Sequence, residues 1–228
     1  MKMHFGVMTA LITPLLNDGI TLNEKAYVEI IEDQIKNGVH SLLTMGGTGE
    51  SLTLPRETKK RAMELAVKTV NHRVPVIASV VELSVYDAIE SAKVVKESGA
   101  DVLLLSNPYG GNTRLSGVID FFKMVDDAVD MPMIIYNFPG RTGYNVTPDI
   151  VGKLLDAVPN ICGIKECAER FEQTMELVGH FGDRMAVLSG NEFLGAWEML
   201  CGADGCVVAT GNVMIKELVK LYDIAKSG

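Results

Sequence analysis

Short, nearly continuous apolar runs alternate along this chain with longer segments in which apolar residues recur every three or four positions. The longer segments, such as residues 22–38, 56–71 and 85–99, have the period of amphipathic helices. The short runs are typical of strands buried on both faces, as in a parallel sheet covered by helices. The pattern therefore predicts eight strands, at residues 7–13, 40–45, 74–81, 101–106, 131–137, 161–165, 185–190 and 205–210.

This alternation predicts an α/β fold, a (β/α)8 TIM barrel, in one domain that spans residues 1–228. Gly38 and Gly99 follow predicted helices at the position where a left-handed residue commonly ends a helix. An open doubly wound sheet is the alternative, but the first strand–helix turn lacks the G-x-G-x-x-G loop of dinucleotide-binding folds. No linker, low-complexity tract or block of charge marks a domain boundary.

Composition narrows the class of protein. The 228 residues are 47% hydrophobic, which is enough for a substantial core, and the formal net charge is −8. Because no basic cluster occurs, nucleic acid and anionic membrane surfaces are not expected partners. The N-terminal segment lacks the charged region and cleavage site of a signal peptide, and no apolar run approaches the roughly 18–20 residues of a membrane span.

The cysteines and histidines predict no metal site. The cysteines form two pairs spaced C-x4-C, which is not the spacing of a zinc ribbon or of a redox motif, and the histidines show no spacing of metal ligands. We therefore expect buried free thiols in a cytoplasmic protein.

Two of the predicted strands end on residues that can carry chemistry. Tyr136 lies near the end of the strand at 131–137, and Lys165 ends the strand at 161–165. Burial disfavours the charged form of an amine, and moving a lysine pKa from about 10.4 to near 7 takes roughly 4–5 kcal/mol. A lysine held neutral in this way is a nucleophile towards ketones. The alternative is a lysine whose ammonium group extends from the strand end into water.

Strand alternation predicts which neighbours share the face of Lys165. If Lys165 points into the barrel, Ile161 and Gly163 point inward as well, whereas Cys162 and Ile164 face the helices. This orientation leaves room beside the amine and argues against a metal role for Cys162.

Two loops at the same end of the predicted barrel are candidate binding segments. GGTGES, at residues 46–51, follows the second strand, and its glycines would let backbone amides approach an anion such as a carboxylate. The alternative is an ordinary turn. YNFPGRTG, at residues 136–143, carries Arg141, whose guanidinium can grip a carboxylate. Its alternative is a solvated loop arginine beside a core tyrosine.

GGTGES, YNFPGRTG and GIKE lie in this order on the second, fifth and sixth predicted strands. Together they resemble the motifs of the dihydrodipicolinate synthase / N-acetylneuraminate lyase family, and the resemblance spans essentially the whole chain. It implies a (β/α)8 barrel lyase of the class I aldolase type, in which a lysine forms an imine with pyruvate and no separate cofactor is used. Lys165 would be the Schiff-base lysine, and Tyr136 would donate and accept protons.

The resemblance also implies the binding residues and the assembly. The amides of Gly47 and Thr48, with the Thr48 hydroxyl, would bind the carboxylate of pyruvate, and the backbone carbonyl of Val207 would face the imine. Arg141 is similar to the arginine that binds the carboxylate of aspartate semialdehyde in the synthases. Members of the family usually form homodimers or homotetramers.

Three departures from the synthase pattern bear on the reaction. Gly47 stands where the synthases have a hydroxyl residue, and Gly110 follows Pro108-Tyr109 where they have a second tyrosine. The family continues into a small helical region after the barrel, which we do not expect within residues 1–228. We expect a dihydrodipicolinate synthase, which joins pyruvate and aspartate semialdehyde in lysine biosynthesis. The alternatives are a 2-keto-3-deoxy sugar acid aldolase and a non-catalytic barrel that binds a keto acid.

Overall fold

The computed structural model describes residues 3–109 and 113–227, and in these residues eight parallel strands close into a barrel. Each strand pairs with the next, and β8 pairs with β1 to complete the ring. The prediction of a (β/α)8 barrel is therefore confirmed, with each predicted strand within a few residues of the observed one. The strands are β1 Gly6–Ala10, β2 Ser41–Thr44, β3 Val76–Val80, β4 Val102–Ser106, β5 Met133–Asn137, β6 Ile161–Glu166, β7 Ala186–Ser189 and β8 Gly205–Val208.

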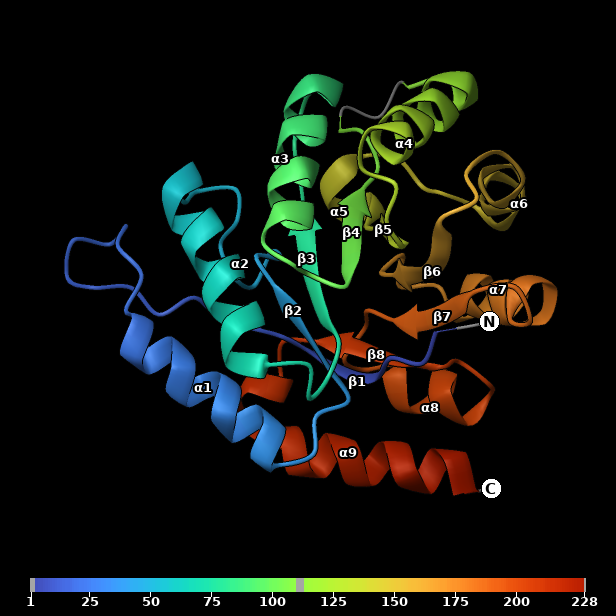
Figure 1. Ribbon diagram of the computed structural model, residues 1–228. Coiled ribbons are helices and arrows are strands. Elements are labelled where there is room, and N and C mark those ends of the chain that lie inside the picture. The colour runs from blue at the N-terminus through green and yellow to red at the C-terminus, as the bar shows by residue number, and fades with distance from the viewer. Residues whose placement is uncertain (1–2, 110–112, 228) are drawn as a thin grey trace.

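Helices surround the strands, so that the sheet is covered on its outer face (Figure 1). Gly38 and Gly99 have φ of 85° and 81° just beyond α1 and α3, which confirms their predicted role at helix ends. No helix in residues 3–109 and 113–227 is long and apolar enough to cross a membrane. The helices are α1 Glu24–Lys36, α2 Arg56–Val70, α3 Val85–Glu97, α4 Leu115–Val129, α5 Pro139–Thr142, α6 Pro148–Ala157, α7 Phe171–Phe181, α8 Gly195–Leu200 and α9 Gly211–Ser227.

Strand alternation divides the apolar side chains into two cores. One core fills the barrel interior, and the other lies between the strands and the helices. On β5, for example, Ile134 and Tyr136 belong to the inner core, whereas Met133 and Ile135 belong to the outer one. Because both faces of each strand are buried, the strands appear in the sequence as continuous apolar runs.

The alternation fails at the start of β6. Ile161 belongs to the outer core and Cys162 packs against the inner one, so the prediction for these two residues is wrong. The cause is a register shift: Met133 pairs with Ile161, but Ile134 pairs with Gly163. The extra residue, Cys162, forms a bulge, so that Ile161 and Cys162 both face opposite to the alternation that Lys165 sets.

The cysteines, which all lie in the described residues, are free thiols. Cys167 and Cys206 are buried and Cys162 is partly buried, as the prediction of buried thiols requires. Cys201 differs, because it is exposed at the end of α8.

Candidate active site

Lys165 and Tyr136 lie side by side at the carboxyl ends of β6 and β5, where they are paired in register. The Lys165 side chain is buried, with 7% of the residue's surface exposed, so its amine does not extend into water. Its Nζ lies 4.6 Å from the centroid of the Tyr136 ring. The carboxyl ends of the strands are the end of a (β/α)8 barrel at which active sites are built.

Burial sets the protonation of both groups. Desolvation lowers the pKa of Lys165, and the positive charge of Arg141 acts in the same direction, while Cys167 and Glu192 oppose it. The amine is therefore shifted toward its neutral, nucleophilic form. Desolvation also raises the pKa of Tyr136, so that its phenol keeps its proton at neutral pH. In the resting site Tyr136 is a proton donor, and it can accept a proton only after giving one away.

The GGTGES loop begins with a strained turn at the end of β2. Met45 is fully buried and has a φ of 56°, a left-handed conformation that costs an ordinary residue about 1–2 kcal/mol. This turn directs Gly47 and Thr48 to the cavity that Lys165 lines. Thr13 holds the loop from outside, because its hydroxyl donates to the Gly49 carbonyl at 2.8 Å.

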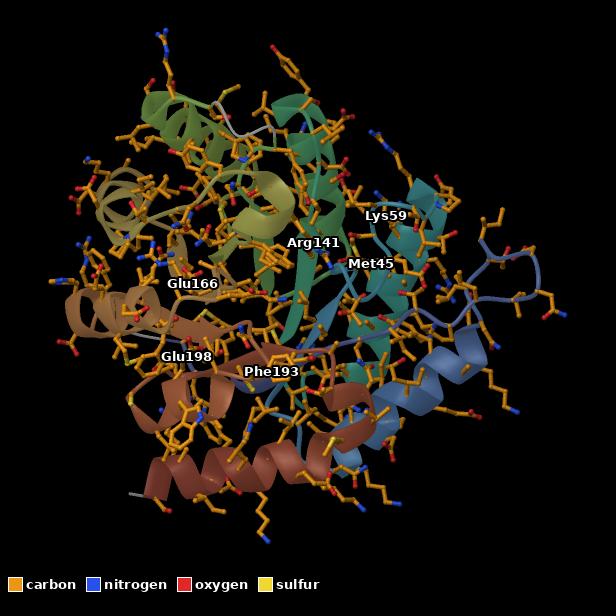
Figure 2. All side chains as sticks on the ribbon, turned by 180° about the vertical axis from the view of Figure 1, so that it is seen from behind. Met45, Lys59, Arg141, Glu166, Phe193 and Glu198 are labelled. Atoms are coloured by element: carbon orange, nitrogen blue, oxygen red, sulfur yellow. The ribbon has the colours of Figure 1, made fainter. Side chains whose placement is uncertain are left out.

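Arg141 reaches the same cavity from α5. Its Cζ lies 4.8 Å from the centroid of the Phe138 ring, a cation–π contact. The helix is held by Asn107, whose Nδ2 donates to the Thr142 hydroxyl at 3.1 Å, and it ends at Gly143, which has a φ of 74°. Arg141 and Phe193 lie toward the centre of the view in Figure 2, and Glu166 lies to their left.

An open cavity of about 610 Å³ brings all of the predicted site residues together. Its wall is formed by residues of four strands, β1, β5, β6 and β8, and by segments that follow strands. Residues from the predicted site that line it are Gly47, Thr48, Tyr136, Arg141, Lys165 and Val207. Gly110, where the second synthase tyrosine is missing, lies outside the described residues.

Sequence reasoning missed several cavity residues. Cys167 lines the cavity two positions after Lys165, and desolvation raises the pKa of its thiol to about 11, so it stays protonated. Strand alternation extended by two residues would have found it. Glu192 comes from the loop after β7, where its Oε1 accepts hydrogen bonds of 2.9 Å from the amides of Ala209 and Thr210. No periodicity marks a loop residue of this kind.

A buried polar network holds the two reactive strand ends from outside the barrel. Glu166 follows Lys165, Asn137 follows Tyr136, and both point toward the helices. Asn137 Nδ2 lies 3.1 and 2.9 Å from the two Glu166 carboxylate oxygens, and Gln173 Nε2 donates to Glu166 at 2.9 Å. The backbone amide of Ala168 donates to it at 2.6 Å. Lys165 and Tyr136, which face the barrel interior, can do chemistry. Their chain neighbours Glu166 and Asn137 hold the strand ends in place.

In the described residues, His, Cys, Asp and Glu side chains form no group of three or more that could hold a metal ion. The polar groups that converge on Lys165 are instead a phenol, a guanidinium, a thiol, a carboxylate and the backbone of the GGTGES loop. These groups suit recognition of a small carboxylate next to a reactive amine.

Comparisons with known proteins agree with this geometry. The sequence model of the Dihydrodipicolinate synthetase family matches residues 3–228. A curated 4-hydroxy-tetrahydrodipicolinate synthase from Geotalea uraniireducens (strain Rf4) is 39% identical over 226 residues, which are 99% of this chain and 77% of the relative.

Solved structures give the same result. The chloride-inhibited dihydrodipicolinate synthase from Acinetobacter baumannii, complexed with pyruvate, superposes with a TM-score of 0.94 at 33% identity. That match covers 99% of this chain and 77% of the other. A monomeric dihydrodipicolinate synthase variant superposes with a TM-score of 0.93 at 29% identity, over 98% of this chain and 75% of its own. Because the family model matches residues 3–228, the chain belongs to the dihydrodipicolinate synthase family.

Proposed function

We propose that this protein is a 4-hydroxy-tetrahydrodipicolinate synthase, which joins pyruvate to aspartate semialdehyde through an imine on Lys165. The observation that carries the proposal is the Lys165 amine, which is buried at the mouth of a closed barrel with its Nζ 4.6 Å from the Tyr136 ring. The identity of 39% to a curated synthase supports the same reaction. Lysine biosynthesis is the corresponding pathway.

The first step forms the imine. The lone pair of neutral Lys165 attacks the ketone carbon of pyruvate, and the ketone oxygen takes up a proton to give a carbinolamine. Tyr136 can supply that proton, because its phenol is protonated and its ring lies against the amine. Loss of the hydroxyl group as water then leaves a protonated imine. Gly47, Thr48 and Val207 line the cavity around this group.

The second step forms the carbon–carbon bond. The Tyr136 phenolate left by the first step takes a proton from the methyl carbon, whose electrons move to the imine nitrogen to give an enamine. Tyr136 is then again a phenol and can protonate the aldehyde oxygen. The enamine carbon attacks the aldehyde carbon, the aldehyde oxygen takes up a proton, and the imine re-forms. Attack on the imine carbon by the amino group of the substrate, or by water, releases Lys165. Arg141, at the mouth of the cavity, can bind the carboxylate of the aldehyde.

The reaction as proposed needs no cofactor, because the covalent imine on Lys165 acts as the electron sink. We also propose that residues 1–228 form one domain, since β8 closes the ring against β1. Assembly as a homodimer or homotetramer and a cytoplasmic location are parts of the same proposal.

Borohydride trapping tests the common step. Protein incubated with pyruvate and borohydride is expected to gain the mass of one reduced pyruvate on Lys165, and Lys165→Ala is expected to gain none. Absence of the adduct in the wild type would refute both the synthase and the alternative, a 2-keto-3-deoxy sugar acid aldolase. Turnover of aspartate semialdehyde, measured by coupled reduction of the product, then tests the synthase itself.

Gly47 favours a second candidate, a 2-keto-3-deoxy sugar acid aldolase, because this position lacks the hydroxyl side chain of the synthase pattern. A panel of aldehydes offered with pyruvate separates the two. Faster turnover of a hydroxyaldehyde than of aspartate semialdehyde would identify the aldolase. Binding of pyruvate with no turnover of any aldehyde would identify a non-catalytic barrel.

A further inference from the structure

The guanidinium of Arg141 occupies the space in which a side chain at position 47 would stand. A Cβ built on Gly47 would lie 2.1 Å from Arg141 Nη1, 3.1 Å from Cζ and 3.4 Å from Nη2. Two heavy atoms that are not bonded do not approach to 2.1 Å, so any larger residue at 47 would displace the guanidinium. Because Gly47 does not have a left-handed φ, its backbone conformation is not the reason for a glycine.

Arg141 also contacts the Phe138 ring. Its Cζ lies 4.8 Å from the centroid of the Phe138 ring, and that ring lies 6.1 Å from the ring of Tyr136. Thr142, the next residue, is buried, and its hydroxyl donates to the Phe138 carbonyl at 3.2 Å. The guanidinium thus lies near both the Phe138 ring and Gly47.

The charge of Arg141 acts on the reactive groups of the cavity. It lowers the pKa of Lys165 in addition to the larger effect of burial, and it opposes the effect of burial on the pKa values of Tyr136 and Cys167. A guanidinium directed away from the barrel into solvent would be screened from these groups. Arg141 is an exposed residue, and it lines the same cavity as Lys165.

We propose that Arg141, seated on Gly47, binds the carboxylate of the keto acid itself, and that the Gly47–Arg141 pair determines recognition of this first substrate. The inference rests on the proposed imine chemistry and deepens it. Gly47 and Thr48 line the same cavity as Arg141, so their backbone amides and the guanidinium can bind one carboxylate together. A guanidinium carries five N–H donors, which leaves donors for the carboxylate of the aldehyde.

This placement also suits the charge changes of the reaction. Before pyruvate binds, the cation disfavours an ammonium at Lys165 and so favours the neutral nucleophile. The carboxylate of bound pyruvate then offsets the charge of Arg141. The protonated imine that follows forms beside a neutralised pair rather than beside a free cation.

The test compares pyruvate with pyruvamide, which has the same ketone but no carboxylate. The concentration that gives half-maximal borohydride trapping is measured for wild type, Gly47→Ala, Arg141→Ala and the double variant. Gly179→Ala is the control, because Gly179 lies on α7, outside the cavity, and a Cβ there would meet nothing within 4 Å. The thermal midpoint of each variant shows that it is folded.

We expect Arg141→Ala and Gly47→Ala each to raise the half-trapping concentration of pyruvate by about tenfold or more, since hydrogen bonds to charged groups are lost. The double variant should be no worse than the poorer single variant, because Gly47→Ala acts by displacing Arg141. The half-trapping concentrations of pyruvamide in all variants, and those of both compounds in Gly179→Ala, should stay within about threefold of wild type.

An unchanged half-trapping concentration of pyruvate in Arg141→Ala would overturn the inference, and the proposed function would stand. Effects of Gly47→Ala and Arg141→Ala that multiply in the double variant would overturn the pairing of the two residues. If Gly47→Ala does not fold, the test rests on Arg141→Ala alone. The inference then requires that this variant raise the half-trapping concentration of pyruvate but not that of pyruvamide. Absence of any adduct in the wild type would instead refute the proposed function.

Discussion

Replacement of Glu166 by Ala tests whether the network outside the barrel holds the reactive strand ends in place. Glu166 is 2% exposed, and its carboxylate accepts hydrogen bonds from Asn137, Gln173 and the Ala168 amide. Glu166 and Asn137 are the chain neighbours of Lys165 and Tyr136. The variant should therefore lower both the stability of the fold and the rate at which the imine forms.

The size of the loss follows from the partners that remain. Asn137 Nδ2 and Gln173 Nε2 keep hydrogen bonds to Asn145 Oδ1, at 2.9 and 3.1 Å, whereas the Ala168 amide loses its acceptor. A lost hydrogen bond to a charged group costs roughly 1.5–3 kcal/mol, and relief of carboxylate desolvation offsets part of the total. We expect a net loss of about 2–4 kcal/mol, which lowers the melting temperature on the order of 10 °C at this chain length.

Urea denaturation measures the free energy of unfolding, and borohydride trapping with saturating pyruvate measures the rate of imine formation. Glu176→Ala is the matched control, because it removes an exposed carboxylate from the same helix, α7. Its free energy of unfolding should stay within about 0.5 kcal/mol of wild type. If Glu166→Ala unfolds like Glu176→Ala and traps pyruvate at the wild-type rate, the network does not position the strand ends.

Lys165→Met should give no borohydride adduct and should unfold at the wild-type temperature or above, because an apolar side chain replaces a buried amine; a lower melting temperature by calorimetry would contradict this. Trapping rates in the wild type should fall as pH drops through the lowered pKa of Lys165, and a rate that still climbs near pH 10, close to the ordinary lysine pKa of about 10.4, would argue against a neutral amine. Burial lowers the pKa of His40, whose Nδ1 accepts the Val7 amide at 3.0 Å. The unfolded chain binds a proton at His40 more readily than the folded chain does. The stability that neutral His40 contributes is therefore complete above about pH 6.5 and declines as pH falls toward the lowered pKa. Urea unfolding from pH 5 to 7.5 should show a smaller pH dependence in His40→Asn than in wild type, and equal slopes would rule the effect out.

Local pattern was enough to determine the architecture of this protein. A strand covered on both faces must be apolar at nearly every position, and a helix that packs on one side must be apolar every three or four positions. Both constraints act within a few residues, so the eight strand positions and the helix ends at Gly38 and Gly99 could be read from the sequence. The strand ends at Tyr136 and Lys165 were found for the same reason.

Tertiary structure alone decided which side chains share the cavity. The bulge at Cys162 arises from pairing between β5 and β6, and no local pattern in β6 marks it. Glu192, from a loop, and Arg141, from α5, line one cavity with Lys165, and their positions depend on what these segments pack against. The contact of Arg141 with Gly47 joins residues 94 positions apart. Periodicity reports the environment of a residue relative to its own strand or helix, whereas contacts between loops depend on how the closed ring of strands places them.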